Sequence, residues 1–302
     1  MSPAAAGHRR GLLLMLGATL CWSTAGVLMR TQSLTDGWEA TFWRSVFMLA
    51  FMTVVLSVQY RGAVWRRVAG IGWPGVVSGV LWAVMFVAFI TALARTAVAN
   101  VLVLSSVSPF LAALAGWALL GERVRPGTWI AMLAAFCGIA VMFAASFGEA
   151  GAWGNLIALA IPVAFAANVI VLRRMHARAD MMPTLIVAGV VSCAVTLPFA
   201  LPFDIAWGDV PNFVALGVVQ LGMGCLLMIA AARHLAAAEV GLMAELETVF
   251  GVAAAWLLVG EVPSTATLIG GSIVVLALAA NEALRLWRGD GRAPALEEAA
   301  QP

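Results

Sequence analysis

The chain has 302 residues, of which 63% are hydrophobic and only 11% are charged. An ordinary soluble domain has roughly 25% charged residues, so a soluble fold of this length could not cover so much apolar surface. Trp occurs 12 times and Tyr once, a usage that suits membrane interfaces. The composition predicts a polytopic membrane protein. It excludes a soluble enzyme, a nucleic-acid-binding protein and a disordered scaffold, whereas the net charge of +2 points to no particular partner.

The first apolar run, at about 12–30, follows a polar segment that contains Arg9 and Arg10. It is longer than the core of a signal peptide and has no small-x-small cleavage site, so we expect a retained helix. Charges, Gly/Pro clusters and hydropathy minima divide the rest of the chain into further runs of roughly the 20 residues that cross a bilayer. The polar tail, 289–302, is expected to be disordered. An all-α integral membrane protein with ten transmembrane helices is predicted, at 12–30, 40–58, 72–94, 98–120, 127–147, 154–172, 183–203, 212–232, 238–259 and 265–286.

The basic residues predict the orientation of these helices. All 17 are Arg. If the N-terminus is cytoplasmic, fourteen of them fall on the cytoplasmic side, Arg30 and Arg95 lie outside, and Arg44 lies within the second span. The opposite topology would invert this positive-inside bias. An N-in, C-in arrangement is therefore predicted.

The two halves of the chain repeat each other. The motif Trp117-Ala-Leu-Leu-Gly-Glu122 returns as Trp256-Leu-Leu-Val-Gly-Glu261, at an offset of 139 residues. Near the start of each half, 22–30 aligns with 165–173 at an offset of 143. Five spans per repeat is an odd number, so the second copy has to be inverted. We expect two five-helix repeats, 1–147 and 148–288, which enclose a midplane site as in secondary transporters.

The chain resembles the drug/metabolite transporter superfamily, and within it the ten-helix group with two EamA-type repeats. The departure from the usual motif, Thr248 for a proline, leaves open whether the ninth helix breaks there. The resemblance implies a bacterial inner-membrane exporter of amino acids, related metabolites or amphipathic toxic compounds. It depends on Trp22, on Phe42-Trp43-Arg44, on Ser105-Ser-Val-Ser-Pro109, on the Gly-Glu pairs at 121–122 and 260–261, and on Leu246-Glu247-Thr248-Val249-Phe250, where the family often has Leu-Glu-Pro-Val-Phe.

Four ionisable residues fall inside predicted spans: Arg44, Glu239, Glu245 and Glu247. Each costs roughly 2.5–3.5 kcal/mol on insertion scales, so each needs a reason. Glu239 lies at the start of the ninth span, where it can reach water. Glu245 and Glu247 are deeper, and either of them could bind a proton or serve as a structural acid that is hydrogen-bonded to neighbouring helices.

On one continuous helix, Glu245 and Glu247 would be about 200° apart and would point to opposite sides. Glu245 shares its face with Trp256, and Ser106 in the first repeat has the same spacing to Trp117. We therefore expect Glu245 and Ser106, each with its Trp, to line a cavity. Glu247 is expected on the other side, among small residues that permit close helix contact.

Arg44 cannot lose its charge, so it has to pair with a carboxylate, with backbone carbonyls or with a substrate. It either holds an anionic substrate group in the cavity or tethers Glu247 or helix-end carbonyls as a structural residue. Trp22, Trp82 and Phe86 lie within spans and either shape an aromatic pocket or contribute to packing. The predicted substrate-binding or cavity residues are Trp22, Arg44, Trp82, Phe86, Ser106, Pro109 and Glu245, and the proton-coupling candidates are Glu245 and Glu247.

No nucleotide-binding loop, GxSxG or HExxH motif occurs, and the four Cys residues have no metal-ligand spacing. We therefore expect no cofactor, no metal and no nucleic-acid partner, and we do not expect an enzyme. The main hypothesis is a secondary transporter that works by alternating access. Proton coupling through Glu245 or Glu247 is a subsidiary hypothesis, because burial favours the protonated form of a carboxyl group. The alternatives are an uncoupled facilitator and an integral-membrane lipid-modifying enzyme. One chain contains both repeats, so a monomer in the bilayer would be sufficient.

Overall fold

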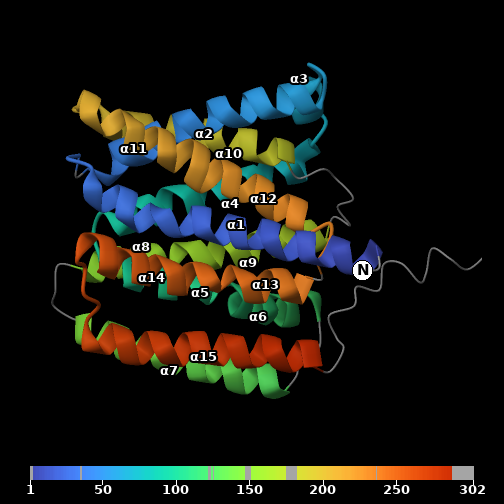
Figure 1. The fold of residues 1–302 in the computed structure, drawn as a ribbon, viewed down its shortest axis with the longest axis vertical. Coiled ribbons are helices and arrows are strands. Elements are labelled where there is room, and N and C mark those ends of the chain that lie inside the picture. Colours follow the sequence, from blue (N-terminus) through green and yellow to red (C-terminus); the bar gives the residue numbers. More distant parts are fainter. Residues whose placement is uncertain are drawn as a thin grey trace, which may run out of the picture.

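The computed structural model describes residues 3–34, 36–121, 124, 126–146, 151–174, 182–235 and 237–287. Every regular element within these ranges is a helix, which confirms the all-α prediction. The helices lie side by side along one common direction (Figure 1). Their bounds are α1 Pro3–Thr31, α2 Gly37–Gln59, α3 Val64–Ala69, α4 Gly72–Leu93, α5 Val98–Ser106, α6 Ser108–Leu120, α7 Pro126–Ser146, α8 Ala152–Ala158, α9 Ala160–Arg174, α10 Met182–Ala200, η1 Trp207–Asp209, α11 Val210–Val214, η2 Ala215–Met223, α12 Gly224–Ala231, α13 Ala237–Ala244, α14 Leu246–Val259 and α15 Thr265–Trp287.

The described helices include nine that are long and apolar enough to cross a membrane. They coincide with the first nine predicted spans. The tenth predicted span falls on α15, whose apolar part, Thr265–Asn281, is shorter. The structure thus shows a multi-pass membrane protein, while the count of ten spans and the N-in, C-in orientation remain predictions. The polar tail, 289–302, lies outside the described residues.

The largest difference in helix boundaries is at the start of the chain. Helix α1 begins at Pro3, well before the predicted start at residue 12. The segment ahead of the apolar run contains several Ala residues, which favour helix, and Pro is well suited to a first helical position. The polar residues around Arg9 therefore continue the helix beyond the apolar part.

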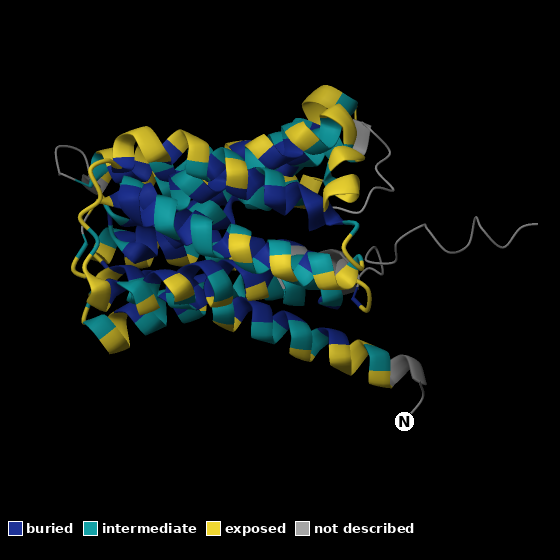
Figure 2. Ribbon diagram, turned by 90° about the horizontal axis from the view of Figure 1, so that it is seen from above, coloured by how far each residue is buried: buried dark blue, intermediate teal, exposed yellow. Residues whose placement is uncertain are grey.

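Surface exposure agrees with a bilayer environment. The inward faces of the helices are buried and the outward faces are exposed (Figure 2). Many of the exposed side chains are large and apolar, such as Ile130 at 71% and Leu257 at 79% exposure. Lipid tails are the natural environment for such surfaces.

The fourth predicted span is broken inside the bundle. Helices α5 and α6 meet at Val107, two residues before Pro109. Proline has no N–H, so the carbonyl of Ser105 loses its normal helical partner. The Ser108 hydroxyl replaces it, with Ser108 Oγ 2.5 Å from Ser105 O. The break is thus encoded locally by Pro109 and Ser108.

The ninth span is also broken, although it lacks the proline. Helices α13 and α14 are separated at Glu245, and the backbone N–H of Thr248 donates to Glu245 O at 3.1 Å. The sequence left open whether this span breaks without the proline, and the structure shows a break at Glu245. Contacts with α5 accompany the break: the Thr248 hydroxyl donates to Leu102 O at 3.5 Å, and a Cβ on Gly251 would lie 2.5 Å from Leu102 Cδ1.

The repeated Trp-to-Glu motif has the same local structure in both halves. Gly121 ends α6 with φ of 68°, and Gly260 ends α14 with φ of 69°. This left-handed conformation favours Gly and is a common helix ending. Helices α5 and α14 run antiparallel, because Val98 at the start of α5 contacts Glu261 after the end of α14, while Leu102 contacts Gly251.

Helices α7 and α15 pair at one edge of the bundle (Figure 1). Their backbones approach closely at Gly138 and Gly270, since a Cβ on Gly138 would lie 2.5 Å from Gly270 O. Small residues at such crossings permit the tight packing that replaces the hydrophobic effect in lipid. The central helices enclose the cavity described below.

Candidate transport cavity

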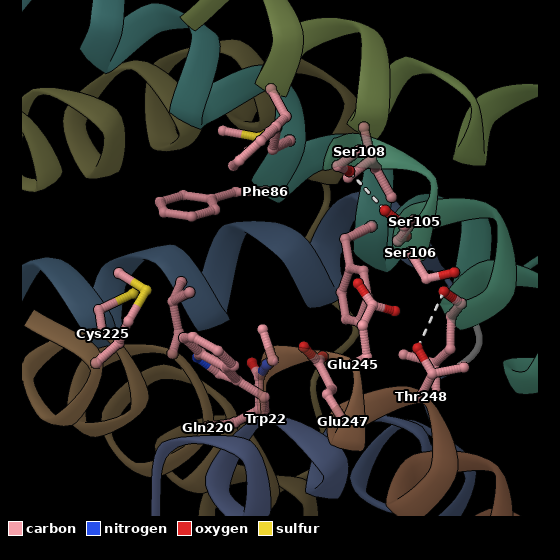
Figure 3. Close-up of a pocket in the computed structure, with 18 of the residues that line it drawn as sticks. Trp22, Phe86, Ser105, Ser106, Ser108, Gln220, Cys225, Glu245, Glu247 and Thr248 are labelled. Atoms are coloured by element: carbon pink, nitrogen blue, oxygen red, sulfur yellow. Dashed lines mark hydrogen bonds between the residues drawn. The ribbon is translucent and has the colours of Figure 1, made fainter. Parts of the chain in front are cut away.

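A cavity of about 420 Å³ lies among α1, α2, α4, α5, α6, α9, η2, α12, α13 and α14. Figure 3 shows several of its side chains pointing into a common space. All of the residues predicted for a cavity or for proton coupling are in its lining: Trp22, Arg44, Trp82, Phe86, Ser106, Pro109, Glu245 and Glu247. Their position at the cavity is therefore a structural finding, while their roles in binding or coupling stay predictions.

The two helix breaks face this cavity with equivalent positions. At the offset of 139 residues, three residues of the first break correspond to three of the second. All six line the cavity: Ser106, Ser108 and Pro109 in the first repeat, and Glu245, Glu247 and Thr248 in the second. The internal repeat therefore places polar groups on two sides of one space, with hydroxyls on one side and carboxyls on the other.

Glu245 and Glu247 both line the cavity, contrary to the expectation that they point to opposite sides. The expectation assumed a narrow lining face, whereas Gly241, Ala244 and Thr248, which lie between the two acids around the helix, also line the cavity, so it contacts about half of the helix circumference. In Figure 3 both carboxyl groups extend from the break at Glu245 into the cavity. Among the described residues, none forms a hydrogen bond or an ion pair with the Glu247 carboxylate.

Trp117 and Trp256 do not line the cavity, so the expectation that they share it with Ser106 and Glu245 was wrong. Both are about half exposed, at 49% and 51%. Trp117 packs edge-on against Trp129, with 5.2 Å between ring centroids. The eleven-residue spacing predicted a shared face, but the lining ends at Pro109 along α6 and at Thr248 along α14, so neither Trp is near enough to the cavity to line it.

Arg44 on α2 is 2% exposed and is held by Gln220 on the π-helix η2. Gln220 Oε1 accepts from Arg44 Nε at 3.2 Å and from Nη2 at 3.0 Å, and Arg44 Nη1 donates to Phe86 O at 3.4 Å. The guanidinium also lies 5.6 Å from the ring centroid of Phe86 and 5.8 Å from that of Phe89. Arg44 is therefore anchored by an amide, a carbonyl and two aromatic rings.

The predicted alternative in which Arg44 tethers Glu247 is not found among the described residues. Arg44 and Glu247 influence each other electrostatically, but no ion pair within 4.0 Å joins them. The sequence analysis missed Gln220, which is the anchor of Arg44. Gln220 is the lone amide in the apolar run 213–231, and its cost in a membrane span was a usable signal.

Aromatic side chains form much of the remaining lining. The rings of Trp82 and Phe86 are 5.7 Å apart, and Phe165 lines the cavity from α9. The Trp22 indole lies directly over Gly224, where any Cβ would overlap Trp22 Nε1. Any side chain larger than that of Gly at position 224 would therefore displace Trp22.

Two other polar residues within the predicted spans, Glu239 and Asn100, lie outside the lining. Glu239 pairs with His8, with 3.6 Å between Oε1 and Nε2. Asn100 bridges neighbouring helices, since its Nδ2 donates to Asn155 Oδ1 at 3.1 Å and its Oδ1 accepts from Thr267 at 2.6 Å. In the described part of the chain, no three His, Cys, Asp or Glu side chains gather as metal ligands would.

A bundle of membrane-spanning helices around a central cavity with buried charges of both signs defines a multi-pass membrane protein of the solute-transporter class. The sequence profile of the EamA-like transporter family matches residues 9–144 and 152–281. The chain therefore belongs to this family and contains two EamA repeats, as the motifs predicted. It is a transporter and not an enzyme.

Two characterised relatives and one solved structure are similar to this chain. The "Pseudopaline exporter CntI" of two Pseudomonas aeruginosa strains is 26% identical over 278 residues, which cover 89% of this chain and 94% of the relative. A protein known from a crystal structure is 22% identical and aligns with a TM-score of 0.59 over 92% of this chain and 98% of its own. At that identity, the structural likeness supports the fold alone.

Proposed function

We propose that this transporter exports a small metabolite that carries both an anionic and a cationic group. The observation that carries the proposal is the cavity, in which the buried cation Arg44 and the carboxyl groups of Glu245 and Glu247 line one space. Similarity to the pseudopaline exporters supports the direction of transport and a metabolite as substrate. Amino acids and related compounds fit this description, and the aromatic lining suits an apolar or flat portion of the solute.

Arg44 is the proposed anion-binding group. A guanidinium has five N–H donors in a fixed geometry. Among the described residues, Gln220 and Phe86 accept hydrogen bonds from three of these N–H groups. Two N–H groups are left for a ligand at the cavity. A carboxylate can accept both, and charge-assisted bonds of this kind are strong in a site of low polarity.

Glu245 and Glu247 are the proposed cation or proton sites. Both groups line the cavity away from bulk water, and burial of a carboxyl group favours its protonated form. A solute ammonium group that enters the cavity can take the place of that proton. Export of the cationic solute would then be coupled to proton entry at the same carboxyl groups.

Alternating access is the proposed mechanism, with ten spans in two inverted repeats and both termini in the cytoplasm of a bacterium. The antiparallel pairing of α5 with α14 and the equivalent breaks on either side of the cavity support it. Residues of both halves line the cavity, so one chain would form a complete site in the inner membrane.

The proposal is tested by solute uptake into proteoliposomes, with and without an imposed pH gradient. The panel contains amino acids, pseudopaline, nucleobases and cationic drugs. We expect accumulation of an amphoteric compound that collapses when the gradient is dissipated. Equilibration without accumulation would identify an uncoupled facilitator, and transport restricted to simple cations would contradict the role given to Arg44.

Replacing the acids tests the coupling. Glu247→Gln and Glu245→Gln are expected to reduce gradient-driven accumulation at least tenfold, because an amide cannot exchange a proton, while solute exchange without a gradient is reduced less. Glu239→Gln is the matched control, since Glu239 is an acid of the same span outside the cavity lining. Unchanged accumulation in the double variant at 245 and 247 would disprove proton coupling at these residues.

A further inference from the structure

An ion pair joins three helices at the end of the bundle opposite the start of α1 (Figure 1). Arg30, near the end of α1, donates from Nε to Glu261 Oε2 at 2.6 Å. The other carboxylate oxygen, Oε1, accepts from the backbone N–H of Val98 at 2.6 Å, at the start of α5. Arg30 Nη2 also donates to Thr96 O at 2.8 Å. One carboxylate and one guanidinium thus connect α1, α5 and the end of α14.

The position of Glu261 depends on the repeated Gly-Glu motif. Gly260 has φ of 69°, and the chain turns back so that Glu261 N lies 3.2 Å from Ala255 O. The carboxylate then meets the N-terminus of α5, where backbone N–H groups have no helical partner and the helix dipole favours an anion. The Gly-Glu motif therefore places the Glu261 carboxylate within hydrogen-bonding distance of both Arg30 and the Val98 N–H.

The cavity extends towards the other end of the bundle. Met228 lines it only one turn before α12 ends at Ala231. Val240 lines it one turn after α13 begins at Ala237. Both positions are at the end where α1 begins, whereas the contacts of Arg30 and Glu261 lie at the opposite end (Figure 1).

We propose that Arg30, Glu261 and the Val98 N–H form a latch that seals the cavity at the end opposite the N-terminus and opens once in each transport cycle. The inference rests on the alternating access proposed above. Both side chains of the ion pair are partly exposed, at 32% and 21%. Water can solvate them when they separate, so the latch can open at a moderate cost in free energy, unlike the fully enclosed Arg44.

Loss of the latch is expected to populate the conformation that is open at this end. The test uses a chain whose four Cys residues are replaced by Ala and whose only thiol is Ser105→Cys, since Ser105 lines the cavity. A membrane-impermeant methanethiosulfonate reagent is applied from either side of the membrane. An N-terminal tag reports which side carries the N-terminus.

In the chain with an unaltered latch, we expect the thiol of Ser105→Cys to be labelled mainly from the N-terminal side. Arg30→Gln and Glu261→Gln should each raise the labelling rate from the opposite side about tenfold, and Arg30→Lys, which retains the charge, by less. Arg95→Gln is the matched control, because Arg95 is an Arg at the same end, just after α4, whose guanidinium donates to Thr91 O of that helix. It should label like the parent chain.

Labelling rates in Arg30→Gln and Glu261→Gln equal to the parent would overturn the latch, provided that labelling from the N-terminal side shows the chains to be folded. An equal effect of Arg95→Gln would also overturn it, because any charge at this end would then suffice. Failure of the proposed function looks different. If the parent transports solute but no chain is ever labelled from the opposite side, alternating access itself is wrong.

Discussion

Replacing Gln220 with Met removes the anchor of Arg44 with little change in side-chain volume. Two hydrogen bonds from the buried guanidinium to Gln220 Oε1 are lost, at Nε and Nη2. Hydrogen bonds to charged groups contribute about 1.5–3 kcal/mol each, so the expected loss is about 3–6 kcal/mol of unfolding free energy. Phe86 and Phe89 still contact the guanidinium, so we expect the lower half of this interval.

The unfolding free energy is measured by denaturant titration in mixed micelles. Solute binding is then measured without denaturant, where each variant is folded. Gln220→Glu is the matched control, since a carboxylate oxygen can accept both bonds and adds an opposite charge. The Gln220→Glu variant should have nearly the same unfolding free energy as the parent chain. It should weaken anion binding, because its carboxylate competes with the bound anion for Arg44. A loss below about 1 kcal/mol in Gln220→Met would mean that Arg44 does not depend on Gln220, and the argument from two charged bonds would be refuted.

Two further predictions concern the helix geometry. Thr248→Pro should change stability by less than about 1.5 kcal/mol and preserve transport because the helix is already broken at this point, whereas Ala254→Pro within α14 should cost about 3 kcal/mol or more. Thermal unfolding measures the loss of stability in both variants. Equal losses of stability would show that the break does not tolerate proline. Gly138→Ala should destabilise the α7–α15 pair by about 1–3 kcal/mol through overlap with Gly270 O, whereas Gly127→Ala meets no atom within 4 Å and should be neutral. If Gly138→Ala were equally neutral, the close approach of the two helices would have to relax freely.

The predicted cavity residues came from two kinds of signal. Charged residues in apolar runs are costly, and this identified Arg44, Glu245 and Glu247. The internal repeat and the family motifs identified Trp22, Ser106 and Pro109, although they said nothing about distances. Trp82 and Phe86 were selected for their aromatic character within a span. All eight are in the lining, but their partners were not foreseen.

The expectations about helix faces failed because the helical period gives the direction of a side chain and leaves the extent of the cavity unknown. The cavity contacts about half of the helix circumference, which includes both Glu245 and Glu247, and it ends at Thr248 before it reaches Trp256.

In the first repeat, Pro109 marks the helix break in the sequence itself. In the second repeat, Thr248 replaces the proline, and the break there is accompanied by contacts with Leu102 on another helix. No local pattern in the ninth span reports those contacts.

The sequence by itself determined the membrane-spanning helices, because long apolar runs are stable only as helices in a bilayer. It also determined the two EamA repeats and the family, since both depend on residue order alone. Only the tertiary structure decided that Gln220 anchors Arg44, that Glu247 faces the cavity and that Glu261 reaches Arg30. Arg44 and Gln220 are 176 residues apart in the chain, and Arg30 and Glu261 are 231 apart. Their contacts depend on how helices are rotated and packed, and hydropathy leaves that rotation undetermined because lipid contacts any apolar face equally well.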